Sequence, residues 1–158
     1  MSLLQDQPLS LPPQYYHYTI GEMIPAITTT QTLLPHPISL DPDERPGVWV
    51  SSHPSWEPTV NRAILIKGKR PLVRFMTKEE TGRACHGLYR ICLSPSVPLV
   101  TWDNYKLMSQ IHVKMIRALE TQFLAAGAQL AQWATSLSPI PHTAWDHIEQ
   151  WTPDGWTP

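Results

Sequence analysis

The chain has 158 residues, 42% of them hydrophobic and 16% charged, and its 12 basic and 13 acidic side chains give a net charge of −1. This length fits one domain with a sizeable core, and the balanced charge argues against the broad basic surface of a nucleic-acid-binding protein. No apolar run approaches the ~20 residues of a membrane span, and the first residues lack the cationic start of a secretory signal. We therefore expect a cytoplasmic protein with no membrane partner.

The proline, cysteine and histidine residues indicate further properties of the fold. The 17 prolines predict short elements joined by defined loops. Cys85 and Cys92 lack the spacing of metal ligands, so we expect free thiols in a reducing compartment. The seven histidines are scattered along the chain, which favours no metal site.

The first third of the chain predicts short strands separated by a loop. A proline-rich N-terminal extension, 1–13, precedes what we expect to be a single α+β domain, 14–158. Within that domain the residue patterns predict a strand at 14–20, a short helix at 21–28, an extended piece at 32–35, an exposed loop at 36–46 and a strand at 47–52.

The rest of the chain predicts more strands and one main helix. A helical turn at 55–63 should be followed by strands at 63–66, 72–76 and 88–93, with a capping box at Thr77 and Glu80. Apolar residues at helical spacing predict the main helix at about 104–126, with Asp103 as N-cap and Gly127 as the stop. The segment from Leu130 lacks a pattern until a strand at 145–151 and a turn at 153–155. The basic stretches at 67–74 and 106–117 are expected to be solvated.

Two polar segments lie inside predicted strands. In the first, the alternation of a strand places Tyr15, His17 and Thr19 on the face opposite Tyr16 and Tyr18. A histidine there can hydrogen-bond a ligand through either ring nitrogen, while adjacent aromatic rings hold a flat group. The alternative is a half-buried histidine bonded to a backbone carbonyl.

The second segment is Gly47-Val48-Trp49-Val50-Ser51-Ser52. Val48 and Val50 should share one face, and Trp49 and Ser51 the other. Here the alternative is a core tryptophan followed by two hydroxyls that cap a turn. Further residues that follow the serines can line the same cleft: Trp56, Glu57 and Asn61.

Taken in order, these segments resemble the ADP-ribosyltransferase fold family. His17-Tyr18-Thr19 is similar to the family's first motif, and Gly47 to Ser52 is similar to its second, Gly-x-aromatic-x-small. By position, Glu149 resembles the glutamate of the third motif. The resemblance implies short strands in a split antiparallel sheet, and its motifs are short.

The resemblance also implies a substrate and a mechanism. Family members cleave the bond between nicotinamide and ribose in NAD and transfer ADP-ribose to an acceptor. Glu149 would be the catalytic residue that faces the developing sugar cation, as carboxylates do in glycoside hydrolysis. The residues expected to bind NAD are His17, Tyr18, Thr19, Trp49, Ser51 and Ser52.

The sequence departs from the family pattern at two positions. Tyr18 stands where the commoner first motif has glycine, which puts the usual carboxamide contact in doubt. His147 stands two residues before Glu149, where arginine-modifying members carry a second acidic residue or glutamine, so arginine is a less favoured acceptor. Glu149 can also be an ordinary solvated strand residue.

Three functions follow from the sequence. The first is an NAD-dependent ADP-ribosyltransferase whose acceptor is a protein, a nucleic acid or a small molecule. The second is a catalytically inactive module of the same fold that binds a nucleotide or a nucleic-acid end. The third is a small phage or bacterial protein-interaction factor that uses tryptophans of its C-terminal region, among them Trp145 and Trp151.

Overall fold

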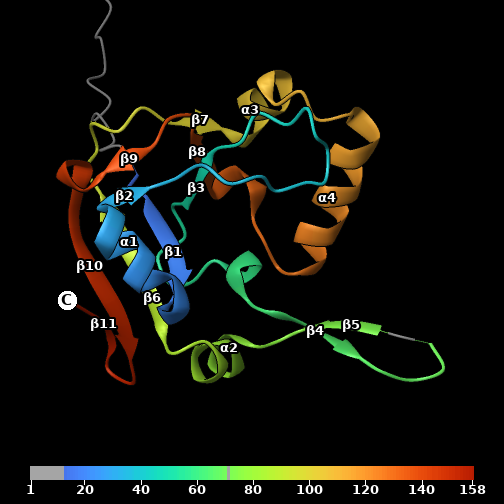
Figure 1. The fold of residues 1–158 in the computed structure, drawn as a ribbon, viewed down its shortest axis with the longest axis horizontal. Coiled ribbons are helices and arrows are strands. Elements are labelled where there is room, and N and C mark those ends of the chain that lie inside the picture. Colours follow the sequence, from blue (N-terminus) through green and yellow to red (C-terminus); the bar gives the residue numbers. More distant parts are fainter. Residues whose placement is uncertain (1–12, 71) are drawn as a thin grey trace, which may run out of the picture.

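The computed structural model describes residues 13–70 and 72–158, so the predicted N-terminal extension lies, except for Pro13, outside the described residues. The chain is an α+β protein built on a seven-stranded antiparallel sheet (Figure 1). In spatial order the strands are β11 (Gly155–Thr157), β10 (Trp145–Thr152), β6 (Leu88–Leu93), β1 (Tyr16–Ile20), β3 (Val48–Ser51), β8 (Trp133–Ser136) and β7 (Val100–Thr101).

Smaller elements surround this sheet. Two further strand pairs are β2 (Thr32–Leu33) with β9 (Ile140–Pro141), and β4 (Ala63–Ile66) with β5 (Leu72–Phe75). The α-helices are α1 (Ile24–Thr30), α2 (Lys78–Ala84), α3 (Trp102–Met108) and α4 (Val113–Ala125). Short 3-10 turns are η1 (Gly21–Met23), η2 (Pro58–Val60), η3 (Leu130–Gln132) and η4 (His142–Ala144).

The two faces of the sheet are buried by different elements. Val48, Val50 and Ile91 pack on one face with Ile27 of α1. Trp133 packs on the other with residues of α3 and α4, and Trp49 packs against that cluster. This confirms the prediction that Val48 and Val50 lie on one face of β3 and Trp49 on the other. In Figure 1, α3 and α4 lie on the side of the molecule away from β10 and β11.

The prediction of one main helix at about 104–126 is wrong, because the chain forms α3 and α4 with a break between them. Gln110 adopts the left-handed region at φ 62°, which no continuous helix allows. Thr101, rather than Asp103, caps α3 by accepting a hydrogen bond from the Asn104 amide. His112 caps α4, since its ring accepts a bond from the Lys114 amide. Neither proline nor glycine marks the break in the sequence.

Four short strands were missing from the prediction: β7, β8, β9 and β11. The prediction of irregular chain from Leu130 is wrong at β8, a buried strand that pairs with both β3 and β7. The Pro-Asp-Gly turn joins β10 to β11, which the sequence analysis did not predict. The capping box at Thr77 and Glu80 is confirmed at the start of α2.

The basic residues of the predicted 67–74 stretch lie on the exposed β4–β5 hairpin, as Lys67, Lys69, Arg70 and Arg74 are all exposed. Cys85 and Cys92 are free, as predicted, and both are buried. Within residues 13–70 and 72–158, none of the helices has the length and apolar character needed to cross a bilayer.

Candidate functional site

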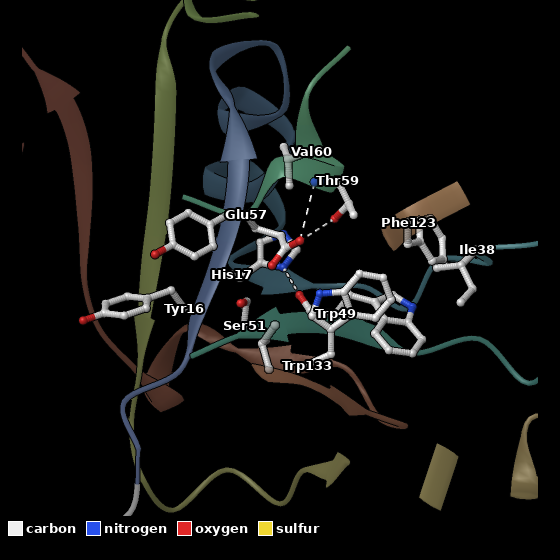
Figure 2. Close-up of a pocket in the computed structure, with 12 residues that line it drawn as sticks. Tyr16, His17, Ile38, Trp49, Ser51, Glu57, Thr59, Val60, Phe123 and Trp133 are labelled. Carbon is white, nitrogen blue, oxygen red and sulfur yellow. Dashed lines mark hydrogen bonds between the residues drawn. The ribbon is translucent and has the colours of Figure 1, made fainter. Parts of the chain in front are cut away.

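The sheet opens between β1 and β3. These strands share a single residue pair, Tyr16 with Ser51, whereas β1 pairs with β6 along its whole length. The divergence leaves a cavity of about 190 Å³ beside β1, shown in Figure 2. Its lining includes His17, Trp49, Ser51, Glu57, Phe123 and Trp133. Segments far apart in the sequence therefore meet at the point where the two strands separate.

His17 offers a hydrogen-bond acceptor to this pocket. Its Nδ1 lies 2.8 Å from the Trp49 carbonyl oxygen, which can only accept, so Nδ1 carries the proton. Burial lowers the pKa of His17 and outweighs the bond to Trp49, and the nearby His36 lowers it further. The imidazole is therefore neutral at pH 7, with a free electron pair on Nε2. No group among the described residues donates to that nitrogen.

Glu57 supplies a buried carboxylate. Only 6% of the residue is exposed, and it lines the same pocket as His17. Its Oε1 accepts bonds from the Thr59 amide at 3.5 Å and the Thr59 hydroxyl at 3.0 Å, which caps η2 (Figure 2). An oxygen acceptor directly before a proline that opens a helical turn is a recognisable N-cap signal. From the sequence, Glu57 was expected to line the cleft, with no role of its own.

Aromatic rings form the other side of the pocket. The Trp49 and Trp133 rings meet edge to face with centroids 5.9 Å apart, and Phe123 meets Trp133 at 4.9 Å. The indole N–H groups of both tryptophans are buried and have no acceptor among the described residues. The pocket thus combines an aromatic wall, whose tryptophans carry two indole N–H groups, with the two acceptors of His17 and Glu57.

The predicted NAD-binding residues divide into two groups. Tyr18 and Ser51 line the pocket together with His17 and Trp49. Thr19 and Ser52 are absent from its lining, and Thr19 is buried. The Tyr18 hydroxyl donates to the His53 carbonyl, and burial raises the pKa of Tyr18 to about 12.

Glu149 lies outside the lining of this pocket, on β10, with β6 between it and β1. Its Oε2 accepts a hydrogen bond from Nε of Arg90, and its Oε1 lies 3.2 Å from His147 Nε2. Burial opposes ionisation of Glu149, but the bonds from Arg90 and His147 outweigh it and lower the pKa of the carboxyl group. The structure brings His17 and Trp49 together and does not bring Glu149 to them.

One cluster has the donor types of a metal site. Ligand atoms of Cys92, His147 and Glu149 lie within 4.8 Å of one another. The Arg90 guanidinium already neutralises the same carboxylate and would repel a cation. Burial also raises the pKa of the Cys92 thiol to about 12, which disfavours the thiolate that binds metals. The absence of a metal site stays a prediction.

Gly47 of the second motif has a packing role. A Cβ added there would lie 2.0 Å from Oγ1 of Thr135, the β8 residue whose hydroxyl donates to the Val48 carbonyl. Only glycine allows β3 to approach β8 this closely.

Comparison of the chain with models of protein families, with curated proteins and with solved structures finds no match. The resemblance to ADP-ribosyltransferases therefore rests on the short motifs alone.

Proposed function

We propose that this pocket binds the nicotinamide end of NAD, and that the chain is an ADP-ribosyltransferase-like enzyme that cleaves the nicotinamide–ribose bond. The observation that carries the proposal is the neutral His17 and the buried Glu57 carboxylate beside an aromatic wall, where β1 and β3 separate. Strands that diverge at this place also agree with the split sheet that the motif resemblance implies.

The two acceptors in the pocket, His17 and Glu57, favour a ligand that donates hydrogen bonds. His17 Nε2 and the Glu57 carboxylate both accept, so a carboxamide N–H or a ribose hydroxyl satisfies them. An anionic ligand group would face the Glu57 carboxylate instead and be repelled. Nicotinamide in NAD carries an amide and a positive ring, both of the favoured kind.

The size and wall of the pocket fit one ring. At about 190 Å³ the cavity is smaller than the ~300–1,000 Å³ of sites that enclose a drug-sized ligand, so the remainder of a dinucleotide would lie outside it. Aromatic faces such as those of Trp49 and Trp133 attract a cationic ring. Both properties support insertion of the nicotinamide end.

Cleavage of the nicotinamide–ribose bond requires the protein mainly to stabilise the positive charge on the sugar and to orient the substrate. The bond between ribose C1′ and the ring nitrogen breaks, its electron pair stays on that nitrogen, and neutral nicotinamide leaves. An acceptor nucleophile then bonds to the sugar cation and loses a proton. We assign the stabilising carboxylate to Glu57 instead of Glu149, because Glu57 lines the pocket and Glu149 is paired with Arg90.

The first experiment measures binding with a matched ligand pair. Calorimetry and thermal shift should show binding of NAD and of nicotinamide but not of nicotinic acid, which has the same ring and a carboxylate in place of the amide. A ligand present at ~100 times its dissociation constant stabilises a protein by ~2.7 kcal/mol, so the shift is measurable. Equal binding of nicotinic acid, or no binding of either compound, would refute this assignment of the pocket.

The second experiment measures release of nicotinamide from NAD. Glu57→Gln keeps the bonds to Thr59 and removes the charge, so it should abolish release while NAD still binds. A Glu57→Gln variant as active as the parent would remove the catalytic role of this residue.

A second candidate is the binding module without turnover. It is favoured by the engagement of Glu149 with Arg90, since the carboxylate of the third-motif position is not free to reach a ligand in this pocket. Binding of NAD with no nicotinamide release from the unmodified chain would select this candidate.

A further inference from the structure

The loop that carries Glu57 is held by side chains from three separate strands. This 53–57 loop, His53 to Glu57, follows β3 and leads into η2. Its three successive carbonyls accept bonds from the Tyr18 hydroxyl of β1, from Nη1 of Arg90 on β6 at 2.8 Å, and from Nε1 of Trp156 on β11 at 2.8 Å. Because the loop contains no strand or helix of its own, these three hydrogen bonds to its carbonyl groups fix the path of its backbone.

Arg90 is at the centre of this arrangement. The residue is 8% exposed, and its guanidinium lies 4.0 Å from the centroid of the Tyr16 ring and 4.6 Å from that of Trp156. A buried guanidinium requires a counter-ion, and Glu149 provides it through Nε of Arg90. Because the guanidinium is planar and carries donors on several edges, Arg90 donates to the Glu149 carboxylate through Nε and to the Pro54 carbonyl through Nη1.

We propose that Glu149 and Arg90 are positioning residues, which hold the 53–57 loop and thereby place the Glu57 carboxylate in the pocket. The part of this inference that concerns catalysis rests on the function proposed above, whereas the part that concerns the loop does not. Glu149 acts through Arg90 and touches no ligand. The third-motif position then matters for activity without being a catalytic residue.

Hydrogen exchange tests the positioning role with no ligand present. The amides of Ser55 and Trp56 donate to Nδ1 of His53 at 3.0 and 3.3 Å, so their exchange reports on the order of the loop. Glu149→Gln removes the charge at nearly constant shape, and Arg90→Lys keeps the charge but loses the fork. Each should accelerate exchange of these amides about tenfold, as loss of a hydrogen bond to a charged group predicts.

The matched control is Glu80→Gln, the same substitution in the ion pair with Arg74 near the exposed hairpin. It should leave exchange in the 53–57 loop unchanged. Unchanged loop exchange in both Glu149→Gln and Arg90→Lys would overturn the proposal. Acceleration that spreads equally over the amides of β1 and β6 would also overturn it, because it would show a general loss of stability.

Trp156→Phe is a milder variant in case the charged pair is needed for folding. It keeps an aromatic ring beside Arg90 and removes the bond to the Ser55 carbonyl. Faster exchange confined to the loop is expected, and no change would count against the proposal. If nicotinamide does not bind at all, the proposed function fails while these exchange results still decide the role of Glu149 and Arg90.

Discussion

The half-buried His17 should make the fold sensitive to acid. Its pKa is lowered mainly by burial, so below the unfolded-state value of ~6.5 the unfolded chain binds a proton that the folded chain does not. The stabilisation is complete above that pH and is lost as the pH falls through the window between the two pKa values. The stability of the protein must therefore fall on acidification.

The change in unfolding free energy that His17 causes has an upper limit, because only one proton is taken up. Stability changes by at most about 1.4 kcal/mol per pH unit, which amounts to no more than about 1.2 kcal/mol between pH 7 and pH 5.5. Urea unfolding at these two pH values measures it against His17→Asn, since the asparagine amide can still donate to the Trp49 carbonyl and does not titrate. The variant should lose less stability than the parent on acidification.

Comparison with an exposed histidine isolates the cause. His142→Asn replaces an exposed imidazole on η4 and should follow the parent. Identical pH dependence of the parent and His17→Asn would show that His17 takes up a proton as readily in the fold as outside it, and would refute the neutral imidazole on which the polarity of the pocket depends.

Three further predictions concern packing and reactivity. Thr77→Ala removes the side-chain acceptor for the Glu80 amide and should cost about 1 kcal/mol in urea unfolding. Gly47→Ala places a Cβ against Oγ1 of Thr135 and should cost about 1–3 kcal/mol, part of which the double variant with Thr135→Ala recovers; an additive double variant would contradict the proposed clash. Cys92, with its raised pKa of about 12, should resist alkylation at pH 8 in the folded protein and react after unfolding, as mass spectrometry would show.

Elements set by local patterns were predictable from the sequence. The alternation of Tyr16 to Ile20 and of Val48 to Ser51 fixes both strands and their faces, because a strand exposes alternate residues to opposite sides. The capping box at Thr77 and Glu80 likewise uses only residues three apart. Interactions this short in range leave their signature in the sequence itself.

Elements set by distant contacts were not predictable in this way. β8 is only four residues long, and two of its residues, Ala134 and Ser136, carry little β preference of their own. It is a strand because β3 and β7 pair with it on both sides. The α3–α4 break lies inside a continuous apolar stripe. It is bonded to a loop about 65 residues earlier in the chain, because the His112 amide donates to the Asp41 carboxylate and the Arg45 amide donates to the Ser109 carbonyl.

The two glutamates show the same limit at the site. Glu149 fits the catalytic position of the motif only by its order along the chain, as a lone glutamate near the start of a late strand. In the fold it pairs with Arg90, because the register of β6 and β10 sets the two residues opposite each other. The register of β1 and β6 sets Tyr18 opposite Arg90 as well, so one row across the sheet joins Glu149 to the 53–57 loop. The carboxylate in the pocket comes instead from Glu57, the residue at the end of that loop. In the positioning role proposed above, Glu149 acts on the site through Arg90 and the 53–57 loop and not through contact with a ligand.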